Sequence, residues 1–238
     1  MVPVPATRKD VGPNNLQGST STDFIRVGET TQTEVQEKLG WLKIGPENPR
    51  AFWGRWITSA SSLAWATVSG TSDVNRMWGA RNLLVEFDEN GRVSGLRAFD
   101  DPELPNEVAA WTKRSGETLD LTQPLLLSVR HRHAWQKGDE RVAAQLSLGA
   151  DKLEFYEENA SHNFSVAPSD LKILKLAGFF AQIPKPETIN ITIDFRKKTQ
   201  AGDHLALELQ WADLVTLLRY IDRVNPQALP PPPKLHKK

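Results

Sequence analysis

The densest group of residues that could bind a ligand is basic and lies near the middle of the chain. The candidate anion-binding residues are Arg130, Arg132, Lys137 and Arg141. Alternate residues of a strand share one face, so Arg130 and Arg132 would point the same way and grip a phosphate or carboxylate with two guanidinium forks. Asp139 and Glu140 oppose that use. An anion site and a solvated strand face both stay open, and the solvated face is favoured because surface charges contribute little.

The same segment contains two histidines at strand spacing. His131 and His133 would place two imidazoles on one face, as a metal pair requires. The remaining ligands would have to come from His162, His204 or a carboxylate, and the spacing points to none of them. We therefore predict no metal site and no cofactor.

No arrangement typical of catalysis is visible elsewhere. The adjacent acidic pairs Asp100-Asp101 and Glu157-Glu158 do not form an acid–base dyad, because neighbours on a strand point to opposite faces. The chain contains neither a Gly-x-Ser-x-Gly nucleophile turn nor a Gly-rich phosphate loop ending in Lys. We predict that the protein is not an enzyme.

Tryptophan is unusually frequent, with eight residues in 238. Four of them lie close together in the sequence, at Trp53, Trp56, Trp65 and Trp78. Large aromatic side chains are usually buried, so core packing is the favoured interpretation. The alternative is an exposed aromatic strip that anchors a protein partner, and these four residues are then the candidate protein-binding site.

The elements around these tryptophans begin with a short helix. Thr31 and Glu34 have the spacing of a capping box, and Val35 and Leu39 share one helix face. Gly40 is a natural residue to end the helix in the left-handed conformation.

Strands are expected to follow this helix. Aromatic and β-branched residues form two runs split by Ser59–Ser62, which predicts a strand pair. Asn90-Gly91 then predicts an antiparallel hairpin with a type I′ turn, because both of its central positions need positive φ.

The pattern of residues 28–40, Gly-x-Thr-Thr-x-x-Glu-Val-x-x-x-Leu-Gly, precedes a Trp-rich strand and the hairpin of residues 84–93. In this respect the chain resembles the SmpA/OmlA (BamE-like) envelope lipoprotein domain over residues 22–100. The resemblance implies helices on one face of a small antiparallel sheet, no enzyme activity and a scaffolding role at the bacterial outer membrane. Trp41 stands where the family usually has Pro, and the insert from Ser69 to Ala80 is long. Because of these departures, a role in the outer-membrane assembly machinery itself is not part of the expectation.

The second half of the chain predicts about seven strands and one helix. Residues 188–196 alternate strictly between apolar and polar, as a half-buried antiparallel strand does. An amphipathic helix follows, with its apolar stripe at Leu214, Leu217, Leu218 and Ile221. This order resembles a pleckstrin-homology-like (PH-like) barrel over residues 121–225, with the helix closing one end. A lipocalin-like closed sheet is the alternative.

Composition sets the remaining expectations. The charges balance at 29 basic and 29 acidic residues, which argues against a nucleic-acid partner. The chain has no cysteine, and no apolar run approaches the roughly 18 residues that span a bilayer. The polar N-terminal segment has too few apolar residues to form a core, which predicts a flexible tether. We expect Met1 to replace a lipidated Cys, so that the native protein is membrane-anchored on the periplasmic side of the bacterial envelope.

The predicted fold class is therefore α+β, a small helix-on-antiparallel-sheet domain followed by a mainly β, PH-like barrel with a C-terminal helix. The predicted segments are a flexible tether (1–21), a BamE-like domain (22–100), a linker (101–120), the PH-like domain (121–225) and a Pro/Lys-rich tail (226–238). The expected function is binding or scaffolding of an envelope protein partner. The alternative is a cytoplasmic membrane-surface adaptor whose basic hairpin binds anionic lipid.

Overall fold

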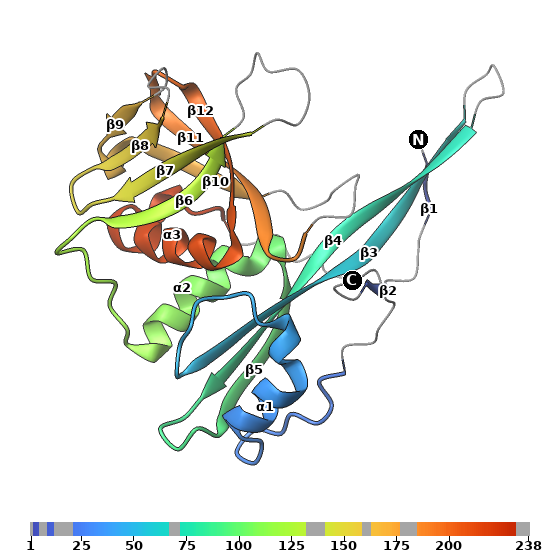
Figure 1. The fold of residues 1–238 in the computed structure, drawn as a ribbon. Coiled ribbons are helices and arrows are strands. Elements are labelled where there is room, and N and C mark those ends of the chain that lie inside the picture. Colours follow the sequence, from blue (N-terminus) through green and yellow to red (C-terminus); the bar gives the residue numbers. More distant parts are fainter. Residues whose placement is uncertain are drawn as a thin grey trace. The chain divides into compact units, whose positions relative to one another are not determined.

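The structure is a computed structural model that describes residues 2–4, 9–11, 21–66, 72–131, 141–158, 163–176 and 185–231. The chain forms two units (Figure 1). Unit 1 comprises Met1–Asp101 and Gly178–Glu187, and unit 2 comprises Pro102–Ala177 and Thr188–Lys238. Among the described residues, each unit contains an antiparallel sheet and at least one helix, which confirms the α+β class.

The helix of unit 1, α1 (Gln32–Leu39), begins as the sequence predicts. Thr31 Oγ1 accepts from the Glu34 amide at 3.3 Å, and a Glu34 carboxylate oxygen accepts from the Thr31 amide at 2.7 Å. The Thr31 amide and the Thr31 hydroxyl both donate to this carboxylate, which holds the pKa of Glu34 below its usual value. The left-handed prediction for Gly40 is wrong. Its φ is −54°, and the chain continues into a 3₁₀ turn, η1 (Gly40–Leu42), which buries Leu42.

The sheet of unit 1 is built on two long strands, β3 (Ala51–Ala66) and β4 (Ser72–Phe87), followed by β5 (Val93–Asp100). The predicted strand pair split at Ser59–Ser62 is wrong, because β3 runs through these serines without turning. The register shifts between Ser59 and Ser61. A one-residue irregularity of this kind bends a strand without ending it, and the segment has neither Gly nor Pro to favour a turn.

The N-terminal segment contributes two short strands. β1 (Val2–Val4) and β2 (Lys9–Val11) both pair antiparallel with β3. Residues 5–8 and 12–20 of the predicted tether lie outside the described residues, so the tether stays a prediction.

The β4–β5 hairpin turns where predicted, but by a different turn. The Gly91 amide donates to the Asp88 carbonyl at 3.0 Å, and the Asp88 amide donates to the Arg92 carbonyl at 2.8 Å. Gly91 has φ +71°. A three-residue loop with a left-handed glycine therefore replaces the two-residue type I′ turn. The reason lies in Asp88, whose Oδ1 accepts from the amides of Asn90 and Arg92 at 2.9 Å each.

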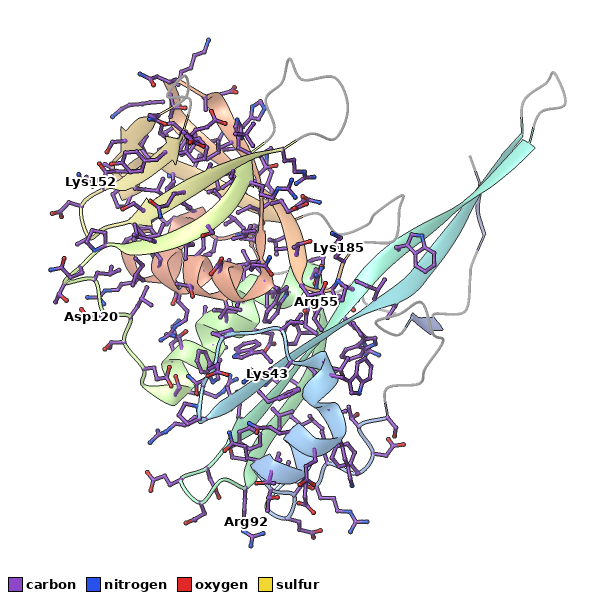
Figure 2. All side chains as sticks on the ribbon, in the orientation of Figure 1. Lys43, Arg55, Arg92, Asp120, Lys152 and Lys185 are labelled. Carbon is purple, nitrogen blue, oxygen red and sulfur yellow. The ribbon has the colours of Figure 1, made fainter. Side chains whose placement is uncertain are left out.

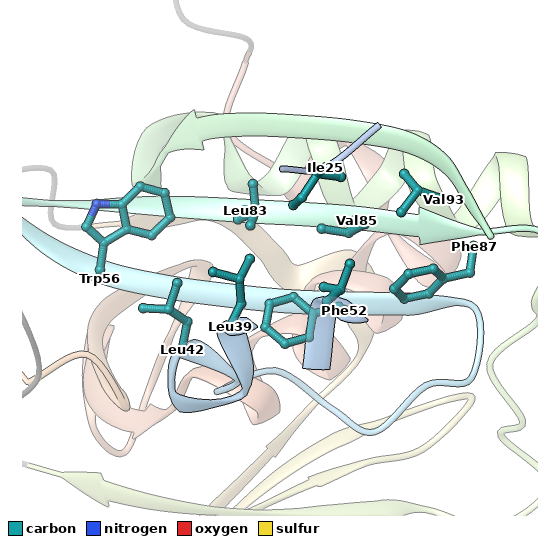
Figure 3. Close-up of a cluster of buried hydrophobic side chains, with 10 residues drawn as sticks. Ile25, Leu39, Leu42, Phe52, Trp56, Leu83, Val85, Phe87 and Val93 are labelled. Carbon is teal, nitrogen blue, oxygen red and sulfur yellow. The ribbon is translucent and has the colours of Figure 1, made fainter. Parts of the chain in front are cut away.

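The core of unit 1 lies between α1, η1 and one face of the sheet (Figure 3). The strands contribute alternate residues to this face, and the helix contributes the pair four residues apart. Its ten buried members are Ile25, Val35, Leu39, Leu42, Phe52, Trp56, Leu83, Val85, Phe87 and Val93. The helix-on-sheet arrangement therefore follows from the two hydrophobic periods in the sequence.

Unit 2 is a seven-stranded antiparallel sheet with the order β10-β11-β12-β6-β7-β8-β9. Its strands are β6 (Leu125–His131), β7 (Val142–Leu148), β8 (Leu153–Glu157), β9 (Phe164–Val166), β10 (Leu171–Leu176), β11 (Thr188–Thr199) and β12 (Gly202–Gln210). The first strand of the unit, β6, pairs with the last, β12, so the sheet curls on itself. A 3₁₀ turn, η3 (Pro168–Asp170), connects β9 to β10.

The apolar stripe of α3 (Trp211–Val224) is fully buried, as predicted for Leu214, Leu217, Leu218 and Ile221. A 3₁₀ turn, η4 (Pro226–Ala228), follows it. The predicted linker contains another 3₁₀ turn, η2 (Asp101–Glu103), and the helix α2 (Leu104–Ser115). The Arg219 guanidinium of α3 lies 5.2 Å from the centroid of the Trp111 ring of α2, so α2 packs on α3 within unit 2.

Candidate functional site

Two of the four candidate tryptophans are core residues. Trp53 is 1% exposed and Trp56 is 5% exposed. The β3–β4 register pairs Trp53 with Leu84 and Trp56 with Arg81, so the two rings project from opposite faces of the sheet. Trp56 belongs to the hydrophobic cluster under α1. Burial of these rings removes them from the predicted exposed strip, because a large apolar ring on a central strand is more stable in the core than in water.

The other two tryptophans lie on the distal part of the β3–β4 pair. Trp78 is partly exposed and pairs with Ser59, while Trp65 is a strand position that pairs with Asp73. The Trp65 side chain is outside the described set. The structure therefore brings Trp65 and Trp78 onto one two-stranded ribbon and leaves Trp53 and Trp56 in the sheet beneath it.

This ribbon is the most distinctive feature of unit 1. β3 and β4 pair from Ala51 with Glu86 to Ala66 with Ser72, whereas β5 pairs with β4 only over Arg81–Phe87. β1 and β2 pair with the outer edge of β3. Among the described strands, none pairs with the outer edge of β4 over Ser72–Ala80, and Figure 1 shows this part of the ribbon running beyond β5.

The basic hairpin of unit 2 is only partly within the described chain. Arg130 and Arg141 are described, and both contact the carboxylate of Glu208 on β12, at 3.7 Å and 3.1 Å. The Arg141 Nη1 also donates to Asn190 Oδ1 at 2.5 Å. Arg132 and Lys137 lie outside the described residues. The two described arginines are therefore held by one carboxylate and do not form an unpaired basic surface.

His131 faces the interior of the curled sheet instead of a metal. It is 6% exposed, its Nδ1 lies 3.1 Å from the Ala206 carbonyl oxygen, and its ring contacts Phe155 edge to face. His133 and His162 lie outside the described residues. Within the described ranges, no group of three or more His, Cys, Asp or Glu side chains could hold a metal ion.

Sequence reasoning missed a buried polar network in unit 1. The Arg55 guanidinium binds Asp101 through two hydrogen bonds, of 2.7 and 3.3 Å, and donates to the Pro186 carbonyl at 2.8 Å. Asn82 Nδ2 donates to Asp101 Oδ1 at 2.8 Å. Arg55 and Lys185 lie close together in Figure 2. The sequence did contain a signal for this network, since Arg55 lies among the aromatic residues of a strand at a position that points inward. A buried charge requires a partner, so such an arginine predicts a buried acid nearby.

Sequence reasoning also missed the partners of Arg141. Glu208 and Asn190 are 67 and 49 positions away from Arg141 in the chain. The one sequence signal for Glu208 and Asn190 was their outward position on strands with alternating polarity. Every solvated strand has such positions, so this signal did not identify them as partners of Arg141.

Comparison with known proteins gives no assignment: no protein-family model matches the chain, and no curated protein matches it. In the part of the chain that the structure describes, no helix combines the length and the apolar character needed to cross a membrane.

Proposed function

We propose that the protein is a non-enzymatic binding or scaffolding protein of the bacterial envelope, held at the membrane by a lipid anchor. The resemblance of residues 22–100 to BamE-like lipoproteins motivates the compartment. A capped helix packed on an antiparallel sheet is consistent with it. Residues 121–225 would then be a PH-like barrel, supported by the order of seven strands and a C-terminal helix.

The observation that carries the binding function is the outer edge of β4. Over Ser72–Ala80 this edge has no strand neighbour among the described residues, although the opposite edge of the ribbon carries β1 and β2. An open strand edge offers a row of backbone donors and acceptors to an extended segment of another protein. We infer that the partner adds a strand to β4, with Trp78 beside it as an aromatic contact.

The membrane-surface adaptor is less well supported. Glu208 forms ion pairs with both Arg130 and Arg141, so its carboxylate offsets part of the positive charge with which this hairpin would attract an anionic membrane. Arg132 and Lys137, the other residues of the basic hairpin, lie outside the described residues.

The first experiment expresses the native gene in a bacterium and follows the location of its product in the cell. We expect the product to fractionate with membranes and its processing to stop when globomycin inhibits lipoprotein signal peptidase. Recovery of the whole native product from the cytosol would contradict the envelope assignment.

The second experiment places a photo-crosslinking residue at Asn75 or Trp78, with Glu89 in the β4–β5 loop as the control. Crosslinks mapped by mass spectrometry should join the β4 positions, and not position 89, to one extended segment of one partner. Two further variants, Asn75→Pro and Arg76→Pro, each remove one backbone amide of β4. Successive amides point to opposite edges of a strand, so one variant loses a bond to β3 and the other loses a donor at the outer edge. The better-folded of the two variants should lose the crosslink. Retained capture in that variant argues against strand addition.

A further inference from the structure

The outer face of the unit 2 sheet carries a polar groove. Alternation along β11 and β12 sends most apolar residues inward and most polar residues outward. The register places Lys175 of β10 opposite Thr192 and Thr192 opposite Ala206. Ala206 is exposed and small, so it leaves a depression between longer neighbours. The cavity measures about 310 Å³, enough for several water molecules at about 30 Å³ each.

The groove has a cationic lining. Its charged lining residues are Arg141 and Lys175, and Asn190 and Thr192 add an amide and a hydroxyl. The nearby carboxylates, Glu208 and Asp194, are already engaged: Glu208 by two arginines and Asp194 by Lys175. Within this group of five side chains, the three cations Arg130, Arg141 and Lys175 therefore outnumber the carboxylates by one.

The lining groups retain donors for a ligand. Arg141 uses Nη1 both for its hydrogen bond to Asn190 and for its ion pair with Glu208. A guanidinium has five N–H donors, so the N–H groups on its other nitrogens remain for a ligand. Lys175 has three ammonium donors and one bound carboxylate. Asn190 uses its Oδ1 towards Arg141, so its amide nitrogen can still donate.

We propose that this groove is a binding site for an oxyanion of the phosphate class. Four donor groups of different kinds line one hollow, on the neighbouring strands β10 and β11 and on the residue before β7. The two oxygens of a carboxylate lie in one plane with its carbon, whereas the three or four oxygens of a phosphate point in different directions and can meet donors from several sides. Arginine forks and lysine ammonium groups are the usual partners of such ions. The site is independent of the strand-addition function of unit 1, and either could fail without the other.

The experiment is a titration of the full chain with inorganic phosphate at low ionic strength, followed by backbone amide chemical shifts. We expect saturable shifts at Asn190, Thr192 and Ala206. Lys175→Gln should weaken binding about tenfold, since a hydrogen bond to a charged group contributes enough for such a loss. Ala206→Ile should abolish binding by filling the hollow, while a β-branched residue suits an exposed strand position.

The matched control is Lys152→Gln. Lys152 pairs with Glu154 in the same unit, and the side-chain exposures of that pair, 57% and 17%, equal those of Lys175 and Asp194. This variant should bind phosphate like the parent chain. Equal loss in Lys152→Gln and Lys175→Gln, or shifts that persist in Ala206→Ile, would overturn the site.

A second arm separates a free ion from a lipid headgroup. Vesicles of phosphatidylglycerol in phosphatidylcholine are added to the parent chain and to Ala206→Ile. Vesicle binding that Ala206→Ile removes identifies the ligand as a headgroup phosphate. Saturable phosphate binding without vesicle binding identifies a soluble phosphate compound, and both results support the groove. Absence of binding in both arms contradicts it.

Discussion

The guanidinium of Arg55 and the carboxylate of Asp101 form a two-bonded ion pair with side-chain exposures of 0% and 1%. The two residues are 46 positions apart, on the first long strand of unit 1 and immediately after its last. A pair so fully removed from water is stable only if its remaining polar atoms are bonded, and the Asn82 amide and the Pro186 carbonyl supply such bonds.

Loss of one member of this pair should be strongly destabilising. Arg55→Met leaves the Asp101 carboxylate buried without its cation, which should cost about 3–5 kcal/mol in the free energy of unfolding. Adding Asp101→Asn should recover part of that loss, because the second charge is removed. Urea unfolding measures both. Arg92→Met, at an exposed position, is the control, and a parent-like midpoint for Arg55→Met would show that the pair does not stabilise unit 1.

Two glycines of unit 1 should respond oppositely to alanine. At Gly91, φ is +71°, where a side chain is strained, so Gly91→Ala should cost about 1–2 kcal/mol. At Gly40, φ is −54° and no atom lies within 4 Å of an added Cβ, so Gly40→Ala should be neutral or stabilise by up to about 1 kcal/mol. Thermal unfolding of both variants measures these changes in stability. Equal changes in the unfolding midpoint would contradict the difference in backbone geometry between the two glycines.

Helix α3 should be a main stabilising element of unit 2. Leu217 is completely buried, so Leu217→Ala should cost about 2–5 kcal/mol by leaving a cavity. Thr216→Ala, one position away at a partly exposed site, should cost much less. A denaturation midpoint for Leu217→Ala close to that of the parent would mean that the helix is peripheral.

The buried Tyr220 should make unit 2 sensitive to alkaline pH. Its hydroxyl donates to the Gly149 carbonyl at 2.9 Å, and burial raises the pKa of Tyr220 to about 12. Because the folded-state pKa lies above the ordinary value of 10, this contribution to stability is complete below pH 10 and is lost as the pH rises towards 12.

The chain has two tyrosines, which makes this measurement direct. In Tyr156→Phe, ultraviolet absorbance should report only Tyr220 and give a midpoint well above 10. Tyr220→Phe should lose about 1 kcal/mol at neutral pH, the value of one hydrogen bond. An ordinary midpoint for Tyr220 in the folded Tyr156→Phe variant would contradict the burial of this hydroxyl.

Local signals predicted the elements well. The Thr31–Glu34 capping box, the position of the β4–β5 hairpin and the stripe of α3 each depend on residues a few positions apart. The turn type failed because Asp88, outside the Asn90-Gly91 pair, selects the longer loop. The Ser59–Ser62 break failed because a strand that is hydrogen-bonded along its whole length tolerates a weak local signal.

Long-range polar contacts could not be predicted. Arg55 binds Asp101 and Pro186, and Arg141 binds Glu208 and Asn190. These contacts depend on which strands pair and in which register, and that information cannot be read from local patterns in one sequence. Burial of Trp53 and Trp56 followed the general preference of tryptophan. The groove beside Ala206 arises from three strands together, and each strand alone looks like an ordinary solvated face.

The assignment of Gly178–Glu187 to unit 1 has a consequence for biosynthesis. Asp101 and Pro186 both bind Arg55, yet after Asp101 the ribosome must add 85 more residues, Pro102 to Pro186, before the second partner exists. At about 5–20 residues per second, this takes about 4–17 s. During that time the Arg55 side chain lacks its acceptors at Lys185 and Pro186, so the N-terminal unit cannot finish folding before most of unit 2 has been translated. A stop codon after residue 101 would remove these acceptors permanently.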